Sequence, residues 1–228
     1  MKYLLLILPV FFFGSIECAG QHSKWKIGMS FTPEYSLTTT QNDLIAAENQ
    51  FGFTTQAVIG YSVDKRMELI SGLVYEFNSI DMIDYTPRLG CDANEGIADL
   101  KNSWLEHDGS VHYLGIPLHA KYNFSPEGNT GYVRLGYNQL FRVSESNITT
   151  LVECNGLNII ETEGSLRNMT SRIDVGIGFE ITSGANSILL LEAVGGYTVT
   201  GVFKDHPIFI NPNILDIGLR LGVLFGGK

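Results

Sequence analysis

The last stretch of the chain, Asn213 to Phe225, constrains the fold most tightly, because its residues alternate between two kinds. One face is wholly apolar and consists of Leu215, Ile217, Leu219, Leu221, Val223 and Phe225. The other face consists of Ile214, Asp216, Gly218, Arg220, Gly222 and Leu224. A period of two is the signature of a β-strand. One apolar face opposite a face of charges and glycines is typical of a strand with lipid outside and a narrow polar interior.

Seven earlier stretches repeat this alternation, so the sequence predicts eight strands. They are Trp25–Ser36, Gly52–Val63, a stretch that begins at Met67, Val111–Phe124, Gly131–Ser144, Met169–Thr182, Ser187–Thr200 and the final stretch. The connections between them are alternately long and short, as in small outer-membrane barrels. We therefore predict an all-β fold: an eight-stranded antiparallel up-and-down transmembrane β-barrel of the OmpA/OmpX type. The last strand should pair with the first and close it.

Alternation alone does not say which face points inward, because a soluble lipocalin-like barrel places its apolar face inside. Two features favour the membrane interpretation. Glycines collect on the polar face, where a narrow barrel needs room: Gly28, Gly60, Gly72, Gly115, Gly136, Gly176, Gly178, Gly218 and Gly222. Aromatic residues of the apolar face cluster near strand ends, where interfacial girdles lie. A soluble lipocalin-like protein is the alternative at the level of fold class.

The polar face carries a nearly balanced set of charges. Six bases and seven acids fall on it: Lys26, Lys121, Arg134, Arg142, Arg172, Arg220, Glu34, Glu68, Glu76, Asp174, Glu180, Glu192 and Asp216. Opposite charges confined in a narrow barrel should pair and fill the space. The sequence therefore predicts a charge-paired lumen and a plugged barrel instead of an open pore.

The first twenty residues read as a secretory signal peptide. Lys2 is followed by the apolar run Tyr3–Phe13, which is too short to span a membrane as a helix, and small residues follow near Cys18. We expect residues 21–228 to form the barrel domain in the outer membrane. A lipidated Cys18 is the alternative interpretation of this segment.

The connections hold most of the formal charge of −9. The predicted loop from about Ser79 to Ser110 is the longest and is strongly acidic. An acidic chain is a poor partner for nucleic acid, so we expect lipid, lipopolysaccharide and envelope proteins as partners, the last through the loops. Cys91 and Cys154 fall in two predicted outer loops, where an exported protein favours a disulfide; the alternative is two free thiols. We expect no metal and no cofactor.

Three segments of the predicted strands are distinctive: Ile27–Phe31, Leu69–Glu76 and Tyr113–Tyr122. They resemble the PorT-type outer-membrane β-barrel family of Bacteroidetes-type bacteria. The resemblance covers nearly the whole mature chain and implies that Pro117 is tolerated within its strand through a bulge. The chain departs from the family pattern at Gly115, where an acid is common, and after Phe225, where three further residues follow. The family implies no single activity.

Three functions fit these observations. The first is a closed structural or interaction barrel with acidic extracellular loops. The second is a binding or transport module with an accessible lumen or ligand-binding loops. The third is a lipid-modifying enzyme, for which His112 with Asp108 or Ser110 would be the candidate residues. The scattered histidines do not converge on a site, so we expect no enzyme.

Overall fold

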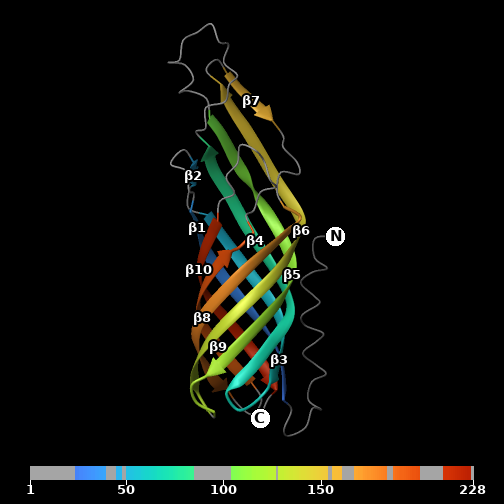
Figure 1. Ribbon diagram of the computed structural model, residues 1–228, viewed down its shortest axis with the longest axis vertical. Helices are drawn as coiled ribbons and strands as arrows, with labels where there is room; N and C mark the ends of the chain where they lie inside the picture. Colours follow the sequence, from blue (N-terminus) through green and yellow to red (C-terminus); the bar gives the residue numbers. More distant parts are fainter. Residues whose placement is uncertain are drawn as a thin grey trace.

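The computed structural model describes residues 24–39, 45–47, 50–84, 104–126, 128–153, 156–160, 167–183, 187–200 and 213–226. Within these ranges, strands of a single antiparallel sheet form the structure (Figure 1). The barrel wall consists of β1 (Trp25–Thr39), β3 (Gln50–Ser62), β4 (Met67–Asp84), β5 (Trp104–Asn123), β6 (Thr130–Glu153), β8 (Met169–Ser183), β9 (Ser187–Thr198) and β10 (Asn213–Gly226). Two short strands, β2 (Ile45–Ala47) and β7 (Gly156–Ile160), pair with β4 and β6. In the described part of the chain, no helix is long and apolar enough to cross a membrane.

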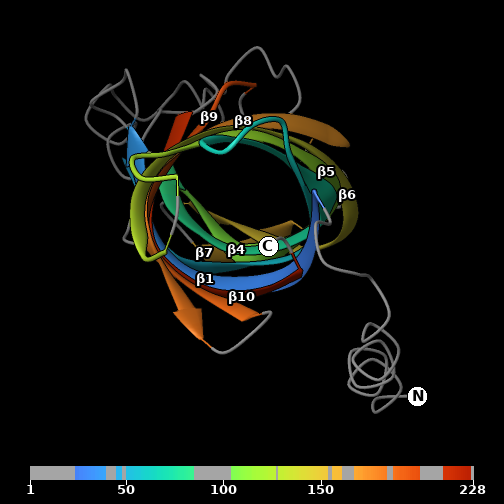
Figure 2. The same ribbon diagram turned by 90° about the horizontal axis from the view of Figure 1, so that it is seen from below.

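The eight wall strands close into a barrel. Their order is β4-β3-β1-β10-β9-β8-β6-β5, and a ladder between β4 and β5 joins the two ends of this row. The first and last wall strands pair from Lys26 opposite Gly226 to Thr39 opposite Asn213. Figure 2, which looks along the barrel, shows the closed ring. The predicted eight-stranded antiparallel barrel and its closure by the last strand are confirmed.

The barrel wall has apolar side chains on the outside and charged side chains on the inside, the opposite of a soluble protein. On the outside, Leu73 is 64% exposed and Phe179 is 61% exposed, while inside Arg172 and Asp174 are each 1% exposed. A continuous apolar belt of this kind would be unstable in water, and lipid is the solvent that suits it. The chain is therefore a membrane-spanning barrel with its charged face inward.

Aromatic contacts mark the two edges of this belt. At the end with the short turns, the rings of Trp25 and Tyr61 lie 4.9 Å apart. Toward the other end, Phe53 contacts Phe77 at 5.3 Å. Ten residues separate Trp25 from Tyr35 on β1, which corresponds to about 33 Å along a strand. At a strand tilt of about 40° this becomes about 25 Å along the axis, the usual height of the apolar band.

Two prolines lie inside wall strands without changing the register. The ladder of β4 with β5 runs from Ser71 opposite Leu118 to Val74 opposite Gly115 and omits the pairs between them, at Pro117. The ladder of β1 with β10 likewise omits the pairs at Thr32 and Pro33. Each proline lacks an N–H, so one neighbouring ladder is interrupted. The bulge implied at Pro117 is therefore wrong; the register shift of β5 lies at His112 and Tyr113, toward β6.

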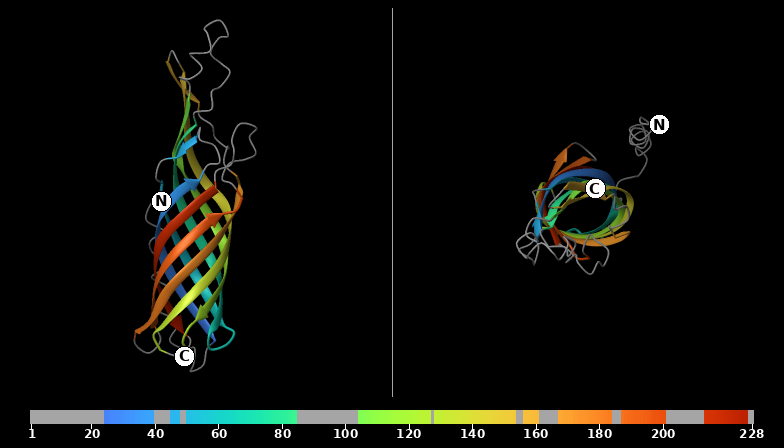
Figure 3. Two further views of the ribbon diagram at one scale, coloured as in Figure 1. Left: turned by 60° about the vertical axis from the view of Figure 1, so that its left-hand side comes forward. Right: turned by 90° about the horizontal axis from the view of Figure 1, so that it is seen from above.

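Several strands are longer than the sequence predicted. The predicted loop Ser79–Ser110 is shortened from both ends, because β4 continues to Asp84 and β5 begins at Trp104. The predicted loop Glu145–Asn168 contains the end of β6 and all of β7. Spanning a membrane needs only about 9–11 residues, so β4, β5 and β6 continue well beyond the belt. With β2 and β7 they form a sheet that rises above one side of the barrel, the strand extension (Figures 1 and 3).

Candidate functional site

The interior of the barrel is the candidate site, because it gathers the charged side chains. Alternate residues of a strand point to the same face, so the inward positions of seven wall strands converge on a narrow lumen. Twelve of the thirteen predicted lumen residues are at most 7% exposed: Lys26, Glu34, Glu68, Glu76, Lys121, Arg134, Arg172, Asp174, Glu180, Glu192, Asp216 and Arg220. They lie in three layers along the barrel axis.

The layer at the turn end, called here the lysine layer, joins four strands. Glu68 of β4 accepts from two cations: its Oε2 lies 2.8 Å from Lys26 Nζ and 2.6 Å from Lys121 Nζ. Lys121 also pairs with Glu180 of β8. Two bases and two acids therefore neutralise one another across the lumen. Lys121 Nζ lies 5.3 Å from the centre of the Tyr132 ring, which connects this layer to the next.

Glu192 of β9 organises the middle layer. Its carboxylate lies 2.7 Å from Arg134 Nε and 3.2 Å from Arg220 Nη1, and it accepts from the Tyr132 hydroxyl at 3.1 Å. Arg134 Nη1 lies 2.9 Å from His119 Nδ1. Because a guanidinium can only donate, Nδ1 must accept and the proton of a neutral His119 sits on Nε2. Nε2 then donates to Asn138 Oδ1 at 3.0 Å.

The third layer, the Arg172 layer, surrounds a single guanidinium with carboxylates. Glu34 of β1 receives a bidentate pair at 2.7 and 2.9 Å, and Asp174 Oδ1 lies 2.7 Å from Nε. Asp216 and Glu76 lie 3.2 and 3.3 Å from Nη1. The bidentate geometry with Glu34 is the strong form of the arginine–carboxylate pair.

Neutral side chains complete the Arg172 layer and connect it to the middle layer by hydrogen bonds. Ser36 donates to Asp216 at 2.5 Å, and Asn78 donates to Glu76 at 2.6 Å. Asn138, which accepts from His119, donates its amide to Asp174 at 2.7 Å. The three layers thus form one continuous network from the turn end to the level of Glu34.

Glycines on the inner face provide the space for these large side chains. A Cβ atom at Gly196 would overlap the guanidinium of Arg172, and one at Gly176 would overlap the carboxylate of Glu192. On the opposite face, a Cβ at Gly195 would have its nearest neighbour at 4.0 Å, the Asp216 carbonyl oxygen. The glycines on the polar face are therefore part of the site, since they let a narrow barrel hold arginines.

Arg142, the thirteenth predicted lumen residue, lies apart from the network. It is half-buried where β6 leaves the barrel, and it pairs with Glu145 and donates to Asn168 at 2.6 Å. Cys91 and Cys154 lie outside the described residues, as does the predicted signal peptide. Among the residues that are described, no group of three or more His, Cys, Asp or Glu is placed to hold a metal ion.

In the predicted strand Val111–Phe124, His112 is expected on the polar face together with His119, and the structure contradicts this prediction. His112 is on the outer wall, with Nδ1 2.7 Å from the Tyr75 hydroxyl and its ring 5.1 Å from that of Phe77. Alternation along the strand indicates this placement, because His112 lies two residues before the outward-facing Leu114. Only the backbone of Asp108 is described, so the geometry of a His112–Asp108 pair lies outside the described side chains.

The network spans the lumen. Five bases and seven acids are buried, and four of the acids surround Arg172. Buried ion pairs carry a large desolvation cost that only close, multiple contacts offset, and these side chains make such contacts across the lumen. The arrangement pairs the interior charges with one another across the lumen.

The solved structures that resemble the chain include bacterial surface and outer-membrane proteins of low sequence identity. Neisserial surface protein A (NspA) has a TM-score of 0.47 at 12% identity, covering 90% of this chain and 99% of that chain. Ail, the attachment invasion locus protein of Yersinia pestis, has a TM-score of 0.41 at 11% identity, covering 90% and 100%. OprG from Pseudomonas aeruginosa has a TM-score of 0.40 at 12% identity, covering 91% and 99%. No family model and no curated protein matches the chain. The fold described above rests on the strand order and the closed ladders, not on these scores.

Proposed function

We propose that the chain is a small outer-membrane barrel that acts as a structural or interaction protein and does not conduct. The observation that carries this proposal is the continuous network from Lys26 to Glu34, in which each layer crosses the lumen. A water-filled pore would leave these charges solvated and separated, whereas most of them are in direct contact. The outer-membrane location is supported by the closed barrel and its apolar belt.

The strand extension supports an interaction role. It continues the ladder of β4 and β5 to Asp84 opposite Leu105, and that of β5 and β6 to Trp104 opposite Val152. A hydrogen-bonded sheet presents a firmer surface than loops alone would. We propose that envelope proteins, or lipopolysaccharide, contact the barrel at this end.

Conductance across a planar bilayer tests the closed lumen. Purified, refolded protein should insert without producing stable current steps under applied voltage, while a water-filled porin in the same apparatus gives steps. Reproducible steps from pure protein would rule out the plugged barrel and support the transport alternative. Protease protection of the barrel verifies insertion separately, so that a lack of current is not mistaken for a failure of the protein to insert.

Membership of the PorT-type family is a further proposal. It is supported by the position of the segments that carry the resemblance, since Leu69–Glu76 and Tyr113–Tyr122 lie on the adjacent strands β4 and β5. Proteins encoded beside the gene are the first partners to test, by co-purification from outer membranes. If the proteins encoded beside the gene co-purify no better than in a mock-tagged control, a shared envelope complex would be contradicted.

The disulfide between Cys91 and Cys154 is also a proposal, supported by the export that the signal peptide predicts. Gel mobility of the unfolded protein with and without reductant tests it. A bridge should increase mobility in the absence of reductant, and Cys91→Ser should remove the difference. Identical mobility of the wild-type protein in both conditions would show two free thiols.

A further inference from the structure

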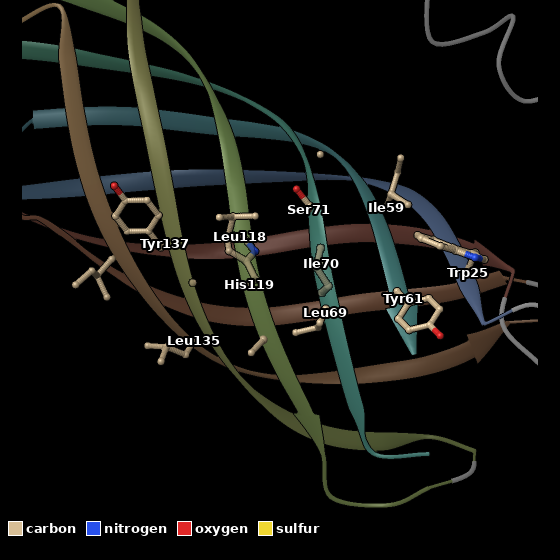
Figure 4. A pocket seen from close by; sticks show the side chains of 14 residues that line it. Trp25, Ile59, Tyr61, Leu69, Ile70, Ser71, Leu118, His119, Leu135 and Tyr137 are labelled. Carbon is tan, nitrogen blue, oxygen red and sulfur yellow. The ribbon is translucent and has the colours of Figure 1, made fainter. Parts of the chain in front are cut away.

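A groove of about 880 Å³ lies on the outer wall of the barrel (Figure 4). Its depth comes from two small side chains among large ones. Ser71 pairs with Ile59 and Leu118 across its neighbouring strands, and Ala120 pairs with Leu69 and Leu135. The short side chains leave a depression that the longer ones border. The groove lies within the apolar belt, so its walls face the hydrocarbon of the membrane.

One end of the groove reaches the aromatic edge of the belt at the turn end. Trp25 and Tyr61 line it there, with their rings 4.9 Å apart. Lys24 Nζ lies 5.8 Å from the centre of the Tyr61 ring. The groove therefore leads from the hydrocarbon region to a cation at the level where lipid headgroups begin.

Two more basic residues lie near the turn end of the groove. Lys65 and Arg66 lie in the turn between β3 and β4, and Arg66 donates to the Tyr122 hydroxyl at 3.1 Å. Backbone hydrogen bonds hold this region together: Ser62 N–H donates to the Lys24 carbonyl, and Asn123 N–H donates to the Arg66 carbonyl, both at 2.8 Å. The acid of the turn, Asp64, uses Oδ1 to accept from the backbone of Arg66 and Met67. Lys24, Lys65 and Arg66 are called the basic rim below.

We propose that the groove and the basic rim bind one phospholipid molecule with an anionic headgroup. An acyl chain lies in the groove between the aromatic edge and Ser71, and the phosphate sits with Lys24 and Arg66. The occupant of a groove inside the belt must come from the membrane, and a lipid is the apolar molecule always present there. Clustered basic residues at a membrane surface favour anionic headgroups over zwitterionic ones. The leaflet is the one in contact with the turn between β3 and β4.

Quenching of Trp25 fluorescence by brominated lipid tests this proposal. The protein carries Trp104→Phe, so that Trp25 is the reporter, and is refolded into vesicles of phosphatidylcholine. A minor fraction of the lipid carries bromine on its acyl chains, either as phosphatidylglycerol or as phosphatidylcholine. Brominated phosphatidylglycerol should quench Trp25 several-fold more than the same fraction of brominated phosphatidylcholine. Equal quenching by the two lipids would overturn the proposal.

Matched variants separate the groove from the rim. Lys24→Gln with Arg66→Gln should remove the preference for the anionic lipid, while Arg167→Gln, which removes a cation near the start of β8, should keep it. Ala120→Leu fills the groove and should abolish the preference, whereas Ala193→Leu makes the same change on the outer face of β9, where Ala193 pairs with Leu219 and Ile177, and should not. Equal effects of the paired variants would contradict the proposal.

Two other results have a definite meaning. Protection of Trp25 from both brominated lipids, together with cross-linked dimers, would show that a second copy of the chain covers the groove. Absence of quenching by any lipid in a monomer would contradict the membrane orientation of the barrel itself. Quenching by both lipids without preference leaves that orientation intact and removes only the lipid site.

Discussion

Arg172 contacts four carboxylates in the interior, so its charge holds together groups that would otherwise repel one another. Arg172→Met should lower the free energy of unfolding by about 3–5 kcal/mol, the range found when one partner of a buried ion pair is removed. Arg142→Met is the matched control: Arg142 is half-buried at the rim, and its loss should cost about 1 kcal/mol or less. Urea unfolding in detergent micelles measures both values. Equal losses for the two variants would contradict a buried network.

The space that Gly196 leaves for Arg172 can be tested at the same scale. Gly196→Ala places a methyl group into the guanidinium, and overpacking of this kind costs about 1–3 kcal/mol. Gly195→Ala is the control on the outer face, where the nearest atom is 4.0 Å away. The same unfolding measurement should show a loss for the first variant and little change for the second. A larger loss at Gly195 would mean that the two faces of β9 have been assigned the wrong way round.

Asp64 provides a pH test at the turn between β3 and β4. Hydrogen bonds from the backbone N–H groups of Arg66 and Met67 hold the pKa of Asp64 below its ordinary value of 3.8. Because the folded pKa is lowered, the stabilisation is present above pH 3.8 and is lost as the pH falls through the folded pKa. The carbon chemical shift of the Asp64 carboxyl, followed by NMR, should show a midpoint below 3.8. A midpoint at or above that value would show that the turn lacks these bonds.

At the scale of the element, β10 tests the orientation of the wall. Leu219 lies on its outer face between Ile217 and Leu221, and all three are exposed. Leu219→Arg would place a charge in the hydrocarbon, at a cost of about 2–4 kcal/mol near mid-membrane. Val63→Arg, beside the turn after β3, should cost about 0–1 kcal/mol, because the charge can reach the interface. Refolding yield and unfolding in lipid vesicles measure the difference, and equal tolerance of both changes would contradict the belt.

The strands themselves were predictable, and their ends were not. Alternation identifies every wall strand, because lipid on one side and a polar lumen on the other impose a period of two. Beyond the belt that constraint ends, so the outer parts of β4, β5 and β6 carry no such pattern and read as loops. The missed strand β2 is only three residues long and is defined by pairing with β4, a contact that no local pattern encodes. The irregularity at His112 and Tyr113 likewise depends on the partner strand β6.

At the scale of the whole molecule, the sequence indicated which charges face inward but not which of them pair. Glu34 and Arg172 belong to β1 and β8, which are not neighbours in the wall, yet they form the bidentate pair across the lumen. Glu68 similarly bridges Lys26 and Lys121 from β1 and β5. Such pairs depend on the barrel's radius and stagger, which follow from the complete register of all eight wall strands. The near balance of charge on the polar face was readable from the alternation along the strands, and the three layers were not.

The central claim is that water does not fill the lumen, and the reactivity of a cysteine inside it tests that claim most directly. Ser30 of β1 points inward between Lys26 and Glu34 and is 6% exposed. In a chain whose other cysteines are serine, Ser30→Cys should not react with a water-soluble maleimide while the barrel is folded in vesicles. It should react fully after unfolding in urea, and Lys65→Cys in the exposed turn should react in both states. Rapid labelling of Cys at position 30 in the folded barrel, at the rate seen for the turn, would contradict the plugged lumen.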